Sequence, residues 1–302
     1  MERVCVTGGG GYQASWLIQL LLSKGYKVHA TVRDPSDKKN SHLKSLNGAS
    51  DNLLLFKADL LDYNSLRSAI AGCNGVFHVA SPVPPSKVNN PQVELLEPAV
   101  TGTYHVLEAC CQERVKRVVV VSSIAAVTFN PKWPVDQVMD ESCWSDKDYC
   151  KETEKWYCLS KTEAESKAFE YGEKSGLDVV TVCPSLILGP MLQTSVNASS
   201  LFLLKIVRDG LDTIENNTRV VVDVRDVAEA IVLAYEKPEA NGRYICGPHT
   251  VKVEDLVNKL RSLYPNFNYP KRYAFVVEIL YRIWLRREAK TAQVLHWRLL
   301  SH

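Results

Sequence analysis

Tyr157 and Lys161 form a pair whose residue types and spacing can do proton chemistry. Because they stand four positions apart, on a helix they would lie one turn from each other on the same face. A nearby ammonium favours a phenolate over a phenol, so the tyrosine of such a pair can give up its proton. The same spacing also arises by chance on ordinary helix faces, so the interpretation depends on what the rest of the chain places beside it.

Ser123 offers the third group of a possible site. It follows an apolar run at 118–121 that predicts a buried strand. A hydroxyl at the end of this strand would polarise a substrate carbonyl, Tyr157 would protonate its oxygen, and Lys161 would lower the pKa of the tyrosine and hold a nicotinamide ribose. The chain contains no Gly-x-Ser-x-Gly turn of the hydrolase kind. The three residues together favour the reduction of a carbonyl.

A glycine-rich turn near the start of the chain indicates the element that would hold a cofactor. An apolar run at 3–7 predicts a strand, four glycines follow at 8–11, and a helix pattern then leads to a second strand at 28–32. Gly8 and Gly11 would let the backbone approach a pyrophosphate at the positive end of the helix. A flexible turn accounts for one glycine, whereas four between a strand and a helix favour a nucleotide site.

The end of the second strand indicates which dinucleotide would bind. Chains that bind NAD usually carry an acidic residue there, to hold the ribose hydroxyls. Here Arg33 stands at this position, and Lys38 and Lys39 follow. A guanidinium suits a phosphate, and a lysine adds charge, so the sequence predicts NADP. Asp34 beside Arg33 leaves a solvated basic loop as the alternative.

The first half of the chain continues in a strand and helix rhythm. Further buried-strand patterns lie at 53–56, 76–80, 118–121 and 179–182, with helical patterns at 65–71, 94–113 and 157–175 between them. Apolar strands that alternate with helices predict an α/β fold with a doubly wound parallel sheet of the Rossmann kind. Ligands of such sheets bind beyond the carboxyl ends of the strands, where the candidate residues fall.

Composition excludes several classes of protein. The 302 residues are 46% hydrophobic and 23% charged, with a formal net charge of +2, which gives no indication of a nucleic-acid partner. The nine cysteines show no Cys-x-x-Cys spacing, so we expect no metal. No apolar run reaches the length of a membrane span. Without a signal peptide, we expect a cytoplasmic protein with reduced thiols, and a monomer is the default.

Four separated motifs and three longer segments support a family resemblance. The motifs are Thr7-Gly8-x-x-Gly11, Asp59-Leu60, Ser122-Ser123 and Tyr157-x-x-x-Lys161. The segments are 76–82, 140–146 and 155–158. The motifs resemble those of the extended short-chain dehydrogenase/reductases, and the segments are similar to plant cinnamoyl-CoA reductases, with dihydroflavonol reductases as more distant relatives. The resemblance extends to about Pro270.

The resemblance implies NADPH-dependent reduction of a phenylpropanoid-type carbonyl, with Ser123, Tyr157 and Lys161 as the catalytic residues. It also implies a set of cofactor contacts in this chain: Thr7, Gly8, Gly11 and Tyr12 in the turn, Arg33 and Lys39 at the 2′-phosphate, Asp59 and Leu60 near the adenine, Val79, Ala80 and Ser81 along the cofactor, Tyr157 and Lys161, Pro184 and Ile187 flanking the nicotinamide, and Ser199 near the pocket.

Four positions named here depart from the pattern of cinnamoyl-CoA reductases. The catalytic helix reads Leu159-Ser160 where those enzymes have Tyr-Gly. Phe202 replaces a histidine associated with coenzyme A, although Lys205 is kept, and Val253 aligns with a basic residue. Loss of contacts to the phosphates of coenzyme A would weaken thioester binding and leave hydride transfer intact. An aromatic aldehyde or ketone is therefore an open alternative to a thioester.

Cys150 and Cys158 match positions that can pair as a disulfide in cinnamoyl-CoA reductases. Their separation permits the bond, while a reducing cytosol favours two free thiols, and both outcomes stay open.

The second half of the chain is expected to form the substrate side of the protein. We predict an NADP-binding domain at 1–185, a substrate-binding lobe at 186–270 with elements that return to the core, and an atypical tail at 271–302. Residues 219–227 predict a strand that enters a helix capped by Asp223, and 243–246 and 254–263 predict a strand and a helix of the small lobe.

The tail leaves an alternative function open. Residues 273–287 read as a basic amphipathic helix or as an altered terminus, and membrane contact is the less favoured interpretation. If an altered end impairs the substrate lobe, the chain would be an NADP-binding regulatory or scaffold protein with little turnover. Otherwise its partner is a small-molecule substrate.

Overall fold

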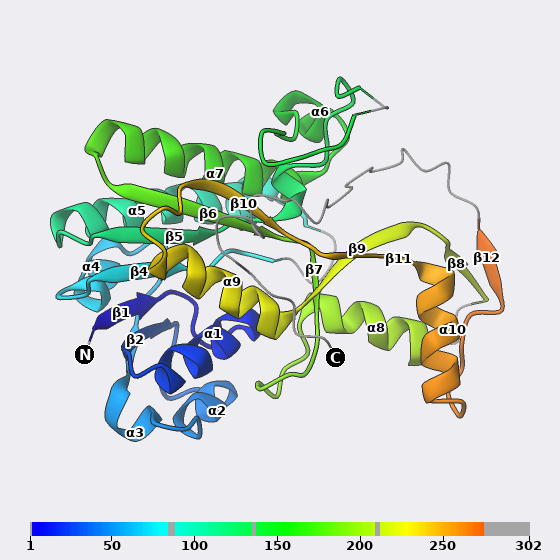
Figure 1. The fold of residues 1–302 in the computed structure, drawn as a ribbon, viewed down its shortest axis with the longest axis horizontal. Coiled ribbons are helices and arrows are strands. Elements are labelled where there is room, and N and C mark those ends of the chain that lie inside the picture. The colour runs from blue at the N-terminus through cyan, green and yellow to red at the C-terminus, as the bar shows by residue number, and fades with distance from the viewer. Residues whose placement is uncertain (1, 84–87, 135–136, 209–211, 275–302) are drawn as a thin grey trace.

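Apolar segments form the sheet at the centre of the protein, and its inner strands are the most deeply buried, whereas the edge strand at 53–57 is partly exposed. The computed structural model describes residues 2–83, 88–134, 137–208 and 212–274. Within these residues seven strands pair in parallel into one sheet (Figure 1). In sheet order they are β10 (Gly242–Cys246), β6 (Asp178–Pro184), β5 (Arg117–Val121), β4 (Gly75–His78), β1 (Arg3–Val6), β2 (Lys27–Val32) and β3 (Leu53–Lys57). The order reverses between β1 and β4, so the predicted doubly wound fold is confirmed.

Helices cover both faces of this sheet and make three layers. On one face lie α1 (Tyr12–Ser23) and α9 (Val224–Glu236), and on the other lie α4 (Tyr63–Ile70), α5 (Glu97–Gln112) and α7 (Trp156–Ser175) (Figure 1). Short elements connect them: η1 (Lys38–Asn40), α2 (Ser41–Lys44), α3 (Ala49–Asn52), the π-helical turn η2 (Gln92–Leu96), η3 (Ile124–Ala126) and α6 (Lys147–Glu152).

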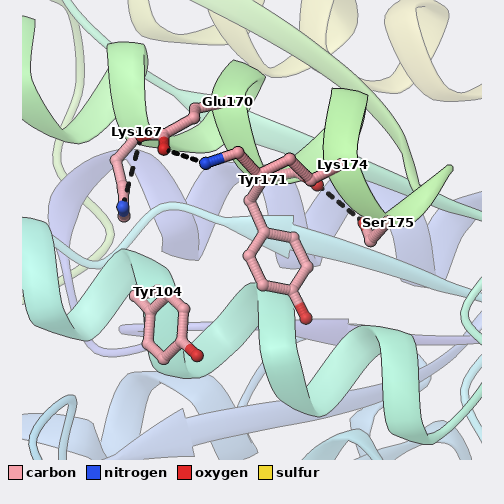
Figure 2. Close-up of a pocket in the computed structure, with 6 residues that line it drawn as sticks. All are labelled: Tyr104, Lys167, Glu170, Tyr171, Lys174 and Ser175. Atoms are coloured by element: carbon pink, nitrogen blue, oxygen red, sulfur yellow. Dashed lines mark hydrogen bonds and ion pairs between the residues drawn. The ribbon is translucent and has the colours of Figure 1, made fainter.

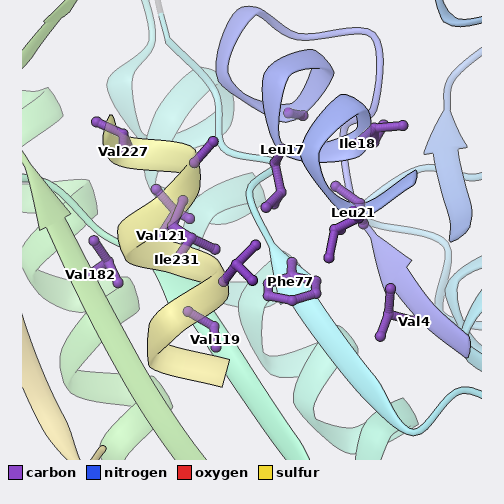
Figure 3. Packing of buried hydrophobic residues seen from close by; sticks show 14 of the residues in the cluster. Val4, Leu17, Ile18, Leu21, Phe77, Val119, Val121, Val182, Val227 and Ile231 are labelled. Carbon is purple, nitrogen blue, oxygen red and sulfur yellow. The ribbon is translucent and has the colours of Figure 1, made fainter. Parts of the chain in front are cut away.

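The core between the sheet and the first helix layer is built mainly from aliphatic and aromatic side chains. Leu17 and Leu21 of α1 and Ile231 of α9 pack over Phe77 of β4 and Val119 of β5, and all are fully buried (Figure 3). Each large side chain removed from water contributes about 1.5–3 kcal/mol, so this layer supplies much of the stability of the fold.

The ends of the helices follow from local side chains. The carboxylate of Asp62 accepts a hydrogen bond from the Ser65 backbone nitrogen at 3.2 Å and begins α4. Asp223 begins α9 in the same way, as predicted, by accepting from the Arg225 nitrogen at 2.8 Å. Gly176, with φ +76°, ends α7 in the left-handed conformation that glycine adopts without strain.

Smaller elements lie beyond one end of the main sheet. They are a three-stranded sheet of β7 (Leu186–Leu188), β9 (Thr218–Asp223) and β11 (His249–Lys252), the pair β8 (Thr213–Glu215) and β12 (Arg272–Ala274), and the helices α8 (Ala198–Arg208) and α10 (Val253–Leu263) (Figure 1). Ile206, Val253, Val257 and Tyr269 form their separate core.

One segment of the second half lies elsewhere than expected. The strand predicted at 243–246 does not lie in the small lobe: as β10 it pairs with β6 at the edge of the main sheet, so it is an element that returns to the core. Tyr244, Ile245 and Cys246 are buried, so the strand has apolar side chains on both faces and requires a sheet that is covered on both sides.

Cys150 and Cys158 are free thiols in the structure. Among the described residues no helix is long and apolar enough to cross a membrane. No group of three or more metal-ligating side chains gathers in the described ranges either. The first two residues of the predicted amphipathic segment at 273–287 belong to β12, and the rest, from 275 onward, lies outside the described residues.

Leu17→Ala is expected to lower the free energy of unfolding by about 2–5 kcal/mol, because it leaves a cavity in a close-packed core. Leu54→Ala is the matched control, since Leu54 is 59% exposed, and it should change stability by about 0.5 kcal/mol or less. Urea denaturation followed by circular dichroism measures both. Equal losses would contradict the position of Leu17 in the core.

Candidate functional site

The carboxyl ends of the parallel strands bring the candidate residues to one edge of the sheet. The glycine turn follows β1, Val79 to Ser81 follow β4, Ser123 follows β5, and Pro184 ends β6. These strands are hydrogen-bonded neighbours, so residues that are far apart in the sequence are adjacent here. This edge is where an open α/β sheet binds its ligand.

The glycine turn is held in place by β2 and β4. The Gly8 nitrogen donates to Thr31 Oγ1 at 3.0 Å, and the Gly9 nitrogen donates to the Thr31 carbonyl at 2.8 Å. Gly8 has φ +70°, and a Cβ on it would lie 3.0 Å from Ala80. The turn therefore requires glycine both for its backbone conformation and for its close approach to β4.

A buried asparagine packs against the glycine turn, and no motif in the sequence predicts this contact. A Cβ on Gly10 would lie 2.1 Å from Asn40 Oδ1. Asn40 is 2% exposed, and its Nδ2 donates to the Asp34 carbonyl at 2.8 Å. Since Gly10 has no positive φ, it is this side chain, and not the backbone conformation, that excludes a larger residue.

The start of α1 fits a bound pyrophosphate. Gly11 is the N-cap and provides no side-chain cap, and no acidic residue lies in the first turn. The positive end of the helix is therefore open to an anion. Three buried polar atoms near this edge have no hydrogen-bond partner among the described residues, namely Tyr12 Oη, Gln13 Nε2 and Ser81 Oγ. Such atoms are rare in the absence of a ligand or water, and they match a polar ligand that crosses the turn.

Thr7, His78 and Thr103 form a buried hydrogen-bonded chain beneath the turn. Thr7 Oγ1 accepts from the nitrogens of Val79 and Ala80, both at 3.0 Å, and lies 2.9 Å from His78 Nδ1. His78 Nε2 lies 3.1 Å from Thr103 Oγ1, which donates to a backbone carbonyl of α5. These bonds require His78 to donate through Nε2 and accept at Nδ1.

Burial lowers the pKa of His78 to about 3, and the charge of Lys161 lowers it further in the same direction. The imidazole is therefore neutral and structural. Thr7 is predicted to contact the cofactor, and its hydroxyl also fixes the backbone that follows β4. Only the pairing of β1 with β4 brings the two residues together.

The basic loop after β2 exposes Arg33 and partly neutralises Lys39. Lys39 Nζ lies 2.7 Å from the carboxylate of Asp37. Asp34 accepts from the nitrogen and the hydroxyl of Ser36, and these bonds hold the pKa of its carboxyl below the usual value. Asp34 is thus occupied by its own turn, and Arg33 is the better placed of the two cations for a phosphate.

Ser123 and Tyr157 come together at the end of β5. The Ser123 hydroxyl acts on the phenol of Tyr157 and opposes the rise in the pKa of the tyrosine that burial causes. Ser123 Oγ also accepts from the Ala125 nitrogen at 3.1 Å, which orients the hydroxyl as the cap of η3. A polarising hydroxyl and a proton-bearing phenol therefore face the same space.

Lys161 lies one turn further along α7 and is buried. Its Nζ donates to the Val121 carbonyl at 2.9 Å. Burial lowers the pKa of Lys161 to about 8, against the opposing charge of Glu165. The expected lowering of the tyrosine pKa is wrong for this structure: burial raises the pKa of Tyr157, and Ser123 is the group that opposes this.

The segment after β6 folds back over the start of α1. Trp16 Nε1 donates to the Pro190 carbonyl at 2.8 Å, and a Cβ on Gly189 would lie 3.4 Å from Tyr12 Oη. Ile187 of β7 is partly buried against the main core. Ser199, in the first turn of α8, accepts from Asn197 Nδ2 at 2.6 Å, and nothing in the structure links it to the turn.

The remaining predicted contacts have structural partners. Asp59 Oδ1 accepts from the Leu61 nitrogen at 2.9 Å. Leu60 packs against α5, where a Cβ on Gly102 would lie 2.8 Å from it, and its carbonyl accepts from His105 Nδ1. Both residues follow β3, which is separated from β4 by β1 and β2 in the sheet.

The positions that depart from cinnamoyl-CoA reductases serve packing in this chain. Val253 is 1% exposed in the core of the smaller elements, and Phe202 packs against that core. The guanidinium carbon of Arg219 lies 5.7 Å from the centroid of the Phe202 ring. Position 253 therefore lies in the core of the smaller elements, which favours an apolar side chain there.

The pocket drawn in Figure 2 lies away from these residues. Tyr104 of α5 and Lys167, Glu170, Tyr171, Lys174 and Ser175 of α7 line it, on the outer side of the two helices. Lys174 Nζ lies 2.6 Å from Glu170 Oε1, an ordinary surface pair. This hollow shares no residue with the candidate site.

Comparison with known proteins gives one family and several close relatives. Residues 4–247 match the model of the NAD dependent epimerase/dehydratase family. Cinnamoyl-CoA reductase 1 of Petunia hybrida is 48% identical over 277 residues, which cover 92% of this chain and 82% of the relative.

Two solved structures are similar over nearly the whole chain. Vestitone reductase from alfalfa (Medicago sativa) superposes with a TM-score of 0.80 at 32% identity, and the match covers 100% of this chain and 94% of that one. Gre2 of Candida albicans in complex with NADPH superposes with a TM-score of 0.81 at 25% identity, covering 99% of this chain and 95% of the other.

Gly10→Ala is expected to destabilise the protein by about 1–3 kcal/mol, because the new methyl group collides with Asn40. In an Asn40→Ala background the same substitution should have a much smaller effect, since the colliding oxygen is gone. Thermal unfolding of the four proteins in this cycle measures the coupling. An equal effect in both backgrounds would show that Asn40 does not shape the turn.

Proposed function

Because the chain belongs to the NAD dependent epimerase/dehydratase family and is an NADP-dependent oxidoreductase of the cinnamoyl-CoA reductase-like group, we propose that it reduces a phenylpropanoid-type carbonyl with Tyr157 as the proton donor. The observation that carries this proposal is the meeting of α7 with the carboxyl end of β5: Lys161 donates to the Val121 carbonyl, and Ser123, which follows this strand, acts on the pKa of the Tyr157 phenol. NADPH, when bound, supplies the hydride.

Ser123 and Tyr157 would have separate roles in the reduction. Ser123 would donate a hydrogen bond to the carbonyl oxygen of the substrate, which polarises the carbon for attack. Tyr157 would transfer its proton to the same oxygen as negative charge develops there. Since burial raises the pKa of Tyr157, the phenol is protonated at neutral pH and ready to act as an acid.

Lys161 would bind and orient rather than transfer the proton itself. Its ammonium donates to the Val121 carbonyl and lies on the buried side of α7. A ribose hydroxyl at this point would be a second acceptor for a group with three donors. The turn at Gly8 and Gly11, Tyr12, and the 79–81 segment would hold the rest of the dinucleotide.

Arg33 supports a preference for NADPH. The guanidinium is exposed at the end of β2, where a 2′-phosphate would approach, and Asp34 is turned into its own loop. Lys39 would add positive charge if its ammonium moved from the carboxylate of Asp37 to the phosphate. Asp59 and Leu60 would lie on the adenine side.

The substrate is proposed at the level of its class. Pro184, Ile187 and Ser199 would border the carbonyl site, in a lobe that we place at 186–270. With Phe202 packed on the lobe core and Val253 inside it, two positions that would contact coenzyme A phosphates are apolar. An aromatic aldehyde or ketone is therefore the favoured substrate over a hydroxycinnamoyl thioester.

Tyr157→Phe is expected to lower kcat by about 100-fold or more, the usual contribution of a general acid. The assay follows NADPH absorbance with a panel of cinnamaldehydes and hydroxycinnamoyl-CoA thioesters. Tyr104→Phe is the control, because Tyr104 is a surface tyrosine of α5 away from the site. If the wild type oxidises NADPH no faster than the Tyr157→Phe variant with every substrate of the panel, the chain binds NADP without turnover.

Arg33→Ala is expected to weaken NADPH binding by about 10- to 100-fold, the range of one charge-assisted hydrogen bond to a phosphate. Binding of NADH should change little, because NADH lacks the 2′-phosphate. Lys116→Ala removes an exposed cation just before β5, at the amino end of the sheet, and should affect neither. Equal affinities of the wild type for NADPH and NADH would contradict the proposed role of Arg33.

A further inference from the structure

A complete ion pair lies inside the protein behind the candidate site. Glu165 of α7 and Arg243 of β10 form two bonds, from Nε to Oε1 at 2.9 Å and from Nη2 to Oε2 at 3.0 Å. The side chain of Glu165 is fully covered, and that of Arg243 is 6% exposed. Burying two charges carries a large desolvation penalty, so a pair of this kind needs all its bonds.

The carboxylate of Glu165 accepts hydrogen bonds from β6, from β10 and from the residue that follows β5. Ser122, directly after β5, donates to Oε2 at 2.7 Å, and Thr181 of β6 donates to Oε1 at 2.6 Å. The Cys183 thiol lies 3.3 Å from Oε1. Together with the guanidinium these groups satisfy both oxygens, so the side chain has one fixed position on the helix.

Arg243 is fixed just as closely. Beyond Glu165 it donates to the carbonyls of Ala126, Glu141 and Cys143. Its guanidinium carbon lies 3.7 Å from the centroid of the Trp144 ring. A planar group with five donors suits this arrangement, and it holds the chain that leads from η3 towards α7.

Glu165 lies one helical turn after Lys161, on the same face of α7. The two side chains contact consecutive residues at the carboxyl end of β5, since Lys161 donates to the carbonyl of Val121, the last residue of the strand, and Ser122, the next residue, donates to Glu165. Among the charged groups near Lys161, Glu165 is the main one that raises its pKa against the effect of burial, and Cys183 adds to it.

Two further titratable groups face Lys161 from its surroundings. His78 on β4 is neutral, since its pKa is lowered to about 3, and the Tyr157 phenol on α7 is protonated, since its pKa is raised. Glu165 is thus the side chain that supplies negative charge to the buried ammonium, while Arg243 balances Glu165 from the far side.

We propose that Glu165 is a positioning residue of the reductase site: held by Arg243, its carboxylate keeps the buried side chain of Lys161 in the ammonium form that binds the nicotinamide ribose. This inference deepens the proposed function, because it assumes that Lys161 contacts NADPH. It assigns to the ion pair a role in cofactor binding beyond stability.

The dissociation constant of NADPH, measured between pH 6 and pH 10 by calorimetry on the full chain, tests the proposal without turnover. In the wild type, affinity should fall as the pH rises above about 8, because Lys161 loses its proton there. In Lys161→Met this dependence should be absent. In Glu165→Gln the same fall should begin about half a pH unit or more lower, because removing the negative charge favours the neutral amine.

Two variants separate charge from structure. Ser122→Ala removes one hydrogen bond to the same carboxylate but keeps its charge, so the position of the fall should stay unchanged. Glu163→Gln removes a carboxylate from the outer side of α7, where it pairs with Lys147 at 2.9 Å. It should behave as the wild type.

A second variant keeps the test decisive if Glu165→Gln does not fold. Replacing both partners, Glu165→Gln with Arg243→Met, leaves no unpaired buried charge. The fall in affinity should again lie at lower pH, because Glu165 is the partner that acts on Lys161. A fall at the wild-type pH in both variants, with only the melting temperature lowered, would overturn the proposal.

Failure of the proposed function gives a different result. If the wild type binds NADPH with this pH dependence but reduces no carbonyl, the role of Glu165 is supported and the proposed reductase activity is contradicted. A wild type whose binding has the same pH dependence as Lys161→Met overturns the inference itself, because Lys161 then does not titrate at the cofactor.

Discussion

A parallel sheet that is covered on both faces is the constraint on which the rest of this structure depends. Its strands can be apolar throughout only because α1 and α9 shield one side and α4, α5 and α7 the other. Since all seven strands of the described main sheet run the same way, their carboxyl ends meet at one edge. The glycine turn, Ser123 and Pro184 come together there as a consequence of topology.

The cofactor edge is shaped by contacts between strands as much as by the glycines themselves. Thr7 holds the nitrogens of Val79 and Ala80, and His78 locks Thr7 from below. Asn40 limits the space at Gly10. The buried histidine has a complete set of partners, so it contributes rigidity and not proton transfer.

The catalytic helix is held by charge. Lys161 donates to the end of β5, while Glu165 accepts from the residue that follows β5 and from β6 and β10, one turn further along α7. These bonds fix the helix along its axis and around it, which sets where the Tyr157 phenol meets Ser123. A helix held by apolar packing alone would be less uniquely placed, because apolar contacts are not directional.

Sequence by itself determined most of the elements and predicted the main groups of the proposed site. The alternation of apolar runs gave six strands of the main sheet, and the glycine spacing and the Tyr157–Lys161 pair identified the reductase family, because these signals are local. Only the tertiary structure decided that β10 joins the main sheet, that Asn40 and His78 support the turn, and that Glu165 meets Arg243. Those contacts join residues tens of positions apart, for example 78 for Glu165 and Arg243, and no local pattern encodes such a distance. The pKa of Tyr157 was misjudged for the same reason, since burial is a property of the folded chain.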